Sequence, residues 1–160
     1  MHRGAEDGAA AVEFALVCSL LFTVVFGIIQ YGLFFNDSLS TRQGVRDGAR
    51  LGVVRNFATS SPCTTEADDM AKLKCSTKRL IGTPAETTYV KVVKPTTWAR
   101  AQPLVVCAVV KTYGTNGLLP MPDGGYASSV TQMSIEQDAT PLPTGSTTSD
   151  TLPAGMTYPC

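Results

Sequence analysis

A single carboxylate at the border of an apolar run is the first side chain with an obvious chemical requirement. Glu13 precedes a stretch, Phe14–Asn36, that contains no charged residue. An unpaired carboxylate inside a membrane costs about 2.5–3.5 kcal/mol, so Glu13 requires an aqueous border or a cationic partner. If the chain is cut after Gly8, Ala9 gains a free α-amine on the same helix face as Glu13. The pattern then offers an ion pair with the ammonium of the same chain or of a neighbour. The alternative is a flanking charge at the bilayer surface, common in anchor helices.

Cysteines after the apolar run favour disulfides over a metal site. They are Cys63, Cys75, Cys107 and Cys160, without a CxxC pair or a nearby histidine. A zinc site would need four scattered thiolates, whereas disulfides fit an oxidising compartment. If Cys63 pairs with Cys75, a Cys107–Cys160 bond would tie the C-terminal end over the sheet, but four cysteines allow three pairings and the sequence does not choose. Cys18, inside the apolar run, is expected to be a free thiol.

We find no residue set for catalysis, for a cofactor or for a metal ion. The only histidine, His2, would be removed by the cut after Gly8. No HExxH, GxSxG or phosphate-binding glycine loop occurs, and adjacent Asp68 and Asp69 point in different directions on a helix. Trp98 is expected at a surface or an interface. The formal net charge is zero, without a Lys/Arg-rich block, which argues against nucleic acid. We therefore expect neither an enzyme nor a small-molecule substrate.

The charge-free stretch Phe14–Asn36 is long enough to cross a bilayer. As a helix rising ~1.5 Å per residue, it spans the ~30 Å hydrocarbon core. A secretory signal needs an apolar core of only about 7–15 residues, followed by a cleavage site of small residues. Here the run ends in Phe34, Phe35, Asn36 and Asp37. We therefore predict a retained membrane helix rather than a cleaved signal peptide or a buried core helix.

Three segments of the N-terminal third form an ordered set of motifs. They are Asp7–Val17 (DGAAAVEFALV), Phe26–Gly32 (FGIIQYG) and Val45–Val54 (VRDGARLGVV). Together they resemble TadE-like proteins, the minor pseudopilins of tight-adherence (Flp-type) pili. Phe14 matches the aromatic residue that commonly follows the acid, whereas Gln30 stands where the family usually has an acidic residue. Three matches in order are far more specific than any one alone.

The resemblance implies a role in assembly of a tight-adherence (Flp/type IVb-like) pilus or its secretion apparatus. In type IV pilins a prepilin peptidase cuts after such a glycine, so Gly8 and Ala9 would form the processing site. Glu13 and Phe14 would then help subunits assemble. The implied partners are the prepilin peptidase, other pilins or pseudopilins, pilus-assembly proteins and membrane lipid. A membrane-anchored extracellular binding module outside any pilus is the alternative. A membrane-anchored enzyme would need a polar pocket that the sequence does not show.

The charges flanking the helix and the family resemblance predict opposite orientations. Arg3 stands alone before the helix, whereas Arg42, Arg46, Arg50 and Arg55 follow it, which would place the C-terminal domain in the cytoplasm. The resemblance and the even number of cysteines favour a cytoplasmic N-terminus and an extracytoplasmic domain. We adopt the second orientation, in a single-pass protein of the bacterial cell membrane; the cell surface or a pilus are further options.

The helix is expected to continue through about Val54 as an amphipathic helix with two opposite rows of residues. One row is Gly44, Gly48 and Gly52, and the other is Arg42, Arg46 and Arg50. Each glycine costs about 1 kcal/mol relative to alanine, which indicates close approach of another segment. That segment belongs either to the protein's own sheet or to a neighbouring subunit. The arginine row is either a solvated face or a contact with lipid head groups.

The remaining sequence predicts a short helix and a small sheet. Acidic residues come early and basic residues late in Thr65–Leu80, which suits a helix dipole. Strands are expected at Thr87–Lys94, Leu104–Tyr113 and Tyr126–Gln137, with turns at 114–117 and 122–125. The Pro/Ser/Thr-rich tail cannot bury enough surface to fold alone and is expected to be a flexible extension.

The predicted fold class is α+β: a long N-terminal transmembrane helix, continued by an amphipathic helix, packed on a small antiparallel β-sheet. The predicted parts are a leader peptide (1–8), the transmembrane helix (9–36), an extracytoplasmic pseudopilin domain (37–137) and the tail (138–160).

Overall fold

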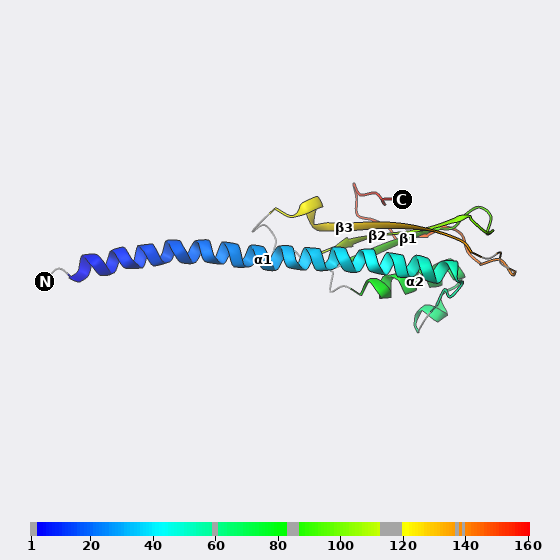
Figure 1. Cartoon of the computed structure of the whole chain (residues 1–160), viewed down its shortest axis with the longest axis horizontal. Helices are drawn as coiled ribbons and strands as arrows, with labels where there is room; N and C mark the ends of the chain where they lie inside the picture. The colour runs from blue at the N-terminus through cyan, green and yellow to red at the C-terminus, as the bar shows by residue number, and fades with distance from the viewer. Residues whose placement is uncertain (1–2, 59–60, 83–86, 113–119, 137, 139) are drawn as a thin grey trace.

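One long helix projects far beyond a layer of strands, which covers only its C-terminal half (Figure 1). The computed structural model describes residues 3–58, 61–82, 87–112, 120–136, 138 and 140–160. The elements are α1 (Arg3–Val53), a 3-10 turn (Cys63–Thr65), α2 (Asp69–Ile81), β1 (Thr87–Val93), β2 (Pro103–Lys111), a second 3-10 turn (Pro122–Gly125), β3 (Tyr126–Ser134) and β4 (Thr148–Ser149). The predicted α+β class is confirmed. The turn predicted at 114–117, and the strand ends predicted at Tyr113 and Gln137, lie outside the described residues.

Helix α1 runs without a break for 51 residues and ends one residue before the predicted position. No proline interrupts it. Its end is a Schellman motif: Arg55 adopts a left-handed φ of 61°, and the N–H groups of Arg55 and Asn56 donate to the carbonyls of Gly52 and Leu51. The chain is thereby turned away from the helix axis and back toward α2.

Helix α2 begins four residues later than predicted, because Asp68 caps it. The Asp68 carboxylate accepts a hydrogen bond of 2.8 Å from the N–H of Ala71. Gly82, in a left-handed conformation (φ 53°), ends the helix. The preceding Cys63–Thr65 segment forms a separate 3-10 turn, so α2 is shorter than the charge order alone indicated.

The sheet is antiparallel throughout, in the order β3-β2-β1-β4. Central strand β2 alternates between two covered faces, which explains its nearly continuous apolar sequence. Leu104, Val106, Ala108 and Val110 face the core formed with α1 and α2. Cys107 and Val109 point to the other face and are buried as well. Figure 1 shows the two helices on one side of the sheet and the C-terminal end on the other.

The tail packs on the domain, which corrects the expectation of a flexible extension. It contributes β4, which pairs with β1. The carboxylate of Asp150 lies 2.7 Å from Lys78 Nζ and 3.1 Å from Lys74 Nζ of α2. The Tyr158 hydroxyl donates to the Asp150 carbonyl at 2.9 Å. The composition of the tail indicated disorder. It gave no sign of these partners, because they lie in distant segments of the sequence.

Trp98 is another correction, because it lies in the core and not at a surface. It is 4% exposed, and its ring meets that of Phe57 edge-to-face, with centroids 6.1 Å apart. The pair fills the end of the core beyond α1.

Candidate functional site

The N-terminal half of α1 is apolar and makes no packing contact within the described chain. Phe14 is 71% exposed and Leu20 is 68% exposed. By length and composition, this is the one helix in the described residues able to cross a membrane, and its apolar window is wholly unburied. An apolar surface of this size requires lipid or other protein segments around it.

The four residues predicted for processing and assembly lie on this exposed part of α1. Gly8, Ala9, Glu13 and Phe14 are all helical and exposed. A Cβ atom built at Gly8 would meet nothing within 4 Å. Ala9 and Glu13 are four residues apart and share one face of the helix. No described residue pairs with the Glu13 carboxylate.

Contact between α1 and the rest of the chain begins at Gln30. Gln30 is 2% exposed, and the hydroxyl of neighbouring Tyr31 donates to the carbonyl of Pro120 at 2.9 Å. From here a stripe of buried residues follows the helix: Gln30, Phe34, Asp37, Thr41, Val45 and Ala49. Sequence reasoning missed Asp37 and Thr41 in this stripe, although their three- and four-residue spacing was a visible signal.

The glycine row packs within the chain. A Cβ atom on Gly44 would lie 2.6 Å from the Cα of Ile81 in α2. One on Gly48 would collide with Thr77, and one on Gly52 would collide with Leu104 of β2. Of the two partners left open by the sequence, the protein's own fold therefore occupies this face, chiefly through α2.

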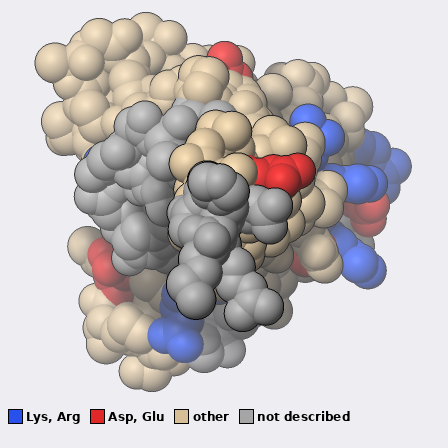
Figure 2. All heavy atoms as spheres, turned by 90° about the vertical axis from the view of Figure 1, so that its left-hand side faces the viewer, with Lys and Arg blue, Asp and Glu red and all other residues tan. Residues whose placement is uncertain are grey.

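The arginine row lies on the opposite flank of α1, beside strand β3. A groove of about 670 Å³ runs along it, lined by Leu39, Arg42, Gln43, Arg46, Asp47, Arg50 and Met133. All three arginines are exposed. The end-on view in Figure 2 shows most of the visible Lys and Arg atoms gathered on one side of the molecule.

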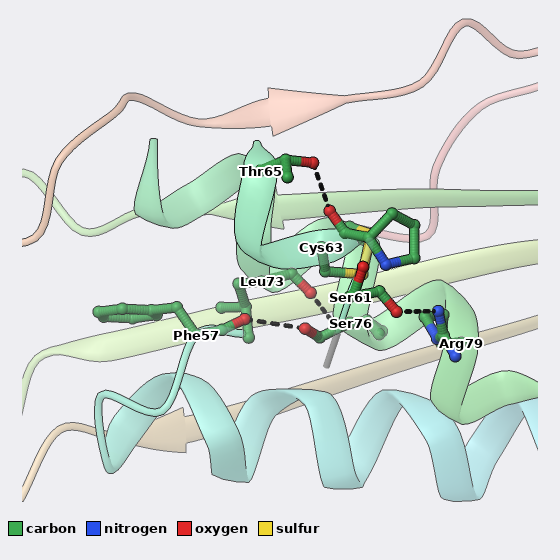
Figure 3. Close-up of a disulfide and its surroundings, with 10 residues drawn as sticks. Phe57, Ser61, Cys63, Thr65, Leu73, Ser76 and Arg79 are labelled. Atoms are coloured by element: carbon green, nitrogen blue, oxygen red, sulfur yellow. Dashed lines mark hydrogen bonds between the residues drawn. A yellow bond between two sulfur atoms is a disulfide. The ribbon is translucent and has the colours of Figure 1, made fainter. Parts of the chain in front are cut away.

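Two disulfides lie in the C-terminal domain, which follows the exposed half of α1, and they join the pairs considered above. Cys63 bonds Cys75, with Cα atoms 5.4 Å apart, and Cys107 bonds Cys160 across 53 residues. Figure 3 shows the first bond between hydrogen bonds that hold the same loop to α2. There Ser76 donates to the Phe57 carbonyl at 2.9 Å, and Arg79 donates to the Ser61 carbonyl at 2.7 Å. Cys18 is free.

No part of the described chain assembles a metal site, since no three His, Cys, Asp or Glu side chains are placed to hold an ion there. The exposed helix, with its lone carboxylate, is therefore the strongest candidate site in these residues.

Comparison with known families matches the part of the chain that carries this site. The model of the family described as TadE-like protein matches residues 8–50. This segment is TadE-like. The match includes Gly8, Glu13 and the arginine row, and it ends before the disulfide-containing domain. No curated protein and no solved structure matches the chain. The TadE-like segment and the exposed apolar helix support the coarse description of a pilus-associated membrane protein.

Proposed function

We propose that the protein is a minor pseudopilin-like subunit, processed by a prepilin peptidase after Gly8, that acts in assembling a tight-adherence pilus or its secretion apparatus. One observation supports this above all: Glu13 is an unpartnered carboxylate at the border of an exposed apolar helix, four residues after Ala9. Cleavage after Gly8 would create an ammonium on that helix face.

The energetics favour assembly through this carboxylate. An unpaired Glu13 opposes entry into lipid by about 2.5–3.5 kcal/mol, whereas pairing with an ammonium removes much of that cost. Within one chain, the amine of Ala9 lies one turn away. Between chains, the amine of one subunit meets the carboxylate of the next only when the apolar helices lie side by side. The ion pair between subunits therefore favours lateral packing of their helices.

The proposed topology has residues 1–8 in the cytoplasm, 9–36 in the membrane and the domain outside. Two disulfides support an oxidising location for the domain. This topology leaves Arg42, Arg46 and Arg50 on the outer side, against the usual charge bias.

Processing is tested by Gly8→Ala, with Gly32→Ala as a matched control. Neither change meets an atom within 4 Å, so neither disturbs packing in the chain. We expect wild type and Gly32→Ala, recovered from native membranes, to begin at Ala9 by intact mass and N-terminal sequencing. Gly8→Ala should accumulate the uncleaved chain. Wild-type protein that retains residues 1–8 would refute processing.

Assembly is tested by Glu13→Gln, which removes the charge and keeps the side-chain size. Glu66→Gln, in an exposed loop, is the control. We expect Glu13→Gln to be processed and inserted normally but to reduce piliation strongly, while Glu66→Gln assembles as wild type. Normal piliation by Glu13→Gln would favour the alternative function, an anchored binding module outside the pilus.

A further inference from the structure

Grooves follow the seam between α1 and β3 from one end of the domain to the other. The first joins Phe34, Phe35 and Arg42 to the start of β3, at Tyr126 and Ser128. The second runs along the arginine row to Met133. The third joins Val53 to the end of β3, at Met133 and Ser134, and to Ile135 and Glu136 just after it. We call this surface, with Arg42, Arg46 and Arg50 on one wall and β3 on the other, the α1–β3 flank.

Strand β3 leaves one edge of the sheet open along this flank. Among the described strands it pairs only with β2, in nine consecutive register positions from Tyr126 to Ser134 without a bulge. Its sequence, YASSVTQMS, contains no charge, proline or glycine. Natural edge strands are usually protected by such residues, by bulges or by a covering segment. The opposite edge, at β1, is covered by β4, so β3 is the edge available for pairing.

The three arginines of the flank differ from the other basic side chains that the structure describes. Every other one has a partner within the chain: Arg55, Lys72, Lys74, Lys78, Arg79, Lys91, Lys94, Arg100 and Lys111. No described residue forms an ion pair or hydrogen bond with the guanidinium group of Arg42, Arg46 or Arg50. The flank therefore presents three unpaired arginines beside an open strand, with Asp47 as the one carboxylate among the residues that line the arginine groove.

Lipid head groups do not fit this row, because it rises away from the apolar helix. Counted from Asn36, Arg42 stands about 9 Å along the helix axis, Arg46 about 15 Å and Arg50 about 21 Å. The head-group layer extends only about 5–8 Å beyond the hydrocarbon core. At most the first arginine reaches it, so the row as a whole is not a head-group contact and is free to meet a protein partner.

We infer that the α1–β3 flank binds an extended acidic segment of another protein, which adds a strand to β3 and places carboxylates against Arg42, Arg46 and Arg50. Same-face side chains of an extended strand recur about every 6.6–6.8 Å, close to the ~6 Å step between residues four apart on a helix. A segment with Asp or Glu at alternate positions thus matches the row in both charge and spacing. Leu39 and Met133, which line the same groove, provide apolar contact between the charged positions.

The test uses the full chain in detergent and a short labelled peptide of alternating glutamate and threonine. We expect saturable binding by fluorescence anisotropy, weakened by salt, together with slower amide hydrogen exchange in β3. The triple variant Arg42→Gln, Arg46→Gln, Arg50→Gln should bind about tenfold more weakly or worse, given about two- to fivefold per exposed ion pair. Arg79→Gln on α2 is the control and should bind as wild type does.

Two further probes separate charge from strand pairing. A glutamine-for-glutamate peptide should lose binding because it lacks carboxylates. A peptide N-methylated at alternate residues keeps its charge but cannot complete the ladder, and should also lose binding. Failure of the acidic peptide to bind, or equal binding by the triple variant or the N-methylated peptide, would overturn the inference. So would a triple variant that loses association only with anionic lipid vesicles, which would assign the row to lipid.

Discussion

The two halves of helix α1 have the same backbone geometry and opposite surroundings. From Gly8 to Ile29 the helix is largely apolar and exposed, with no partner from the described chain. From Gln30 to Val53 one face is buried under α2 and the sheet, through small residues that allow close approach. Helix propensity does not distinguish the halves; their neighbours do.

Because of this difference, substitutions in the two halves of α1 should have different effects. Changes in the C-terminal half, or in the segments that hold it, should alter the stability of the C-terminal domain. Changes in the N-terminal half should leave that stability unaltered and act on insertion or assembly. Buried Trp98, the only tryptophan, reports on the domain by fluorescence.

The largest expected effect comes from removing the disulfide that fastens the tail. Cys160→Ala opens a bond that joins residues 53 apart, which by loop entropy contributes about 4 kcal/mol to the free energy of unfolding. Urea unfolding of the full chain in detergent, followed by Trp98 fluorescence, measures the loss. The control is Cys18→Ala, in the exposed half, and it should unfold as wild type does. If both variants lose the same free energy of unfolding, the two halves of α1 do not differ in their effect on the stability of the domain.

Alanine at two glycines of the same helix compares the halves directly. Gly44→Ala places a Cβ atom 2.6 Å from the backbone of Ile81. We expect it to lower the free energy of unfolding by about 1–3 kcal/mol, despite alanine's better helix propensity. Gly32→Ala meets nothing within 4 Å and should be neutral or slightly stabilising. If Gly44→Ala is also neutral in urea unfolding, α2 does not pack on this row.

The ion pairs of Asp150 with Lys74 and Lys78 should make the packing of the tail on α2 depend on pH. Burial raises the pKa of the Asp150 carboxyl, but hydrogen bonds from Lys78, from the Val90 N–H and from Lys74 outweigh it, so the pKa lies below its usual value. Its stabilisation is therefore complete above the ordinary aspartate pKa of about 4 and is lost as pH falls through the lowered value.

Asp150→Asn should cost about 1–3 kcal/mol at neutral pH and flatten the acid limb of a stability–pH curve. Asp123→Asn, at an exposed turn, is the control and should keep the wild-type curve. An unchanged acid limb in Asp150→Asn would assign the acid sensitivity to other carboxylates.

The smallest effect is expected at the border between the halves. Tyr31→Phe removes the hydroxyl that donates to the Pro120 carbonyl at 2.9 Å, and should lower the free energy of unfolding by about 0.5–1.5 kcal/mol. Amide hydrogen exchange at Met121 should become faster, because its loop loses its tie to α1. Tyr126→Phe, which loses no described hydrogen bond, should change neither. If amide hydrogen exchange at Met121 is unchanged in Tyr31→Phe, the border between the two halves of α1 lies closer to Phe34.

Much of the fold could be predicted because it depends on local patterns. Strand positions followed from apolar runs between turn residues, and the extent of α1 followed from its unbroken apolar and amphipathic pattern. The residues near Gly8 and Glu13 were identifiable by type and spacing alone. Their roles in cleavage and assembly remain predictions.

The remainder could not be predicted because it depends on pairings between distant segments. Asp150 orders the tail through Lys74 and Lys78, more than 70 residues earlier in the chain. Trp98 is buried because Phe57 and the end of the sheet surround it, and nothing in its own neighbourhood indicates that. The open edge of β3 became visible only once the strand order was known.

The unbroken length of α1 has a mechanical consequence, because a helix without proline or kink acts as a lever. The part from Gln30 to Val53 extends about 36 Å beyond the exposed half. Transmembrane helices tilt by about 20° on average, and a change of that size at the membrane would sweep the far end of the domain sideways by about 12 Å. Any rearrangement of neighbouring helices in the bilayer would thus be amplified into a displacement of the far end of the domain.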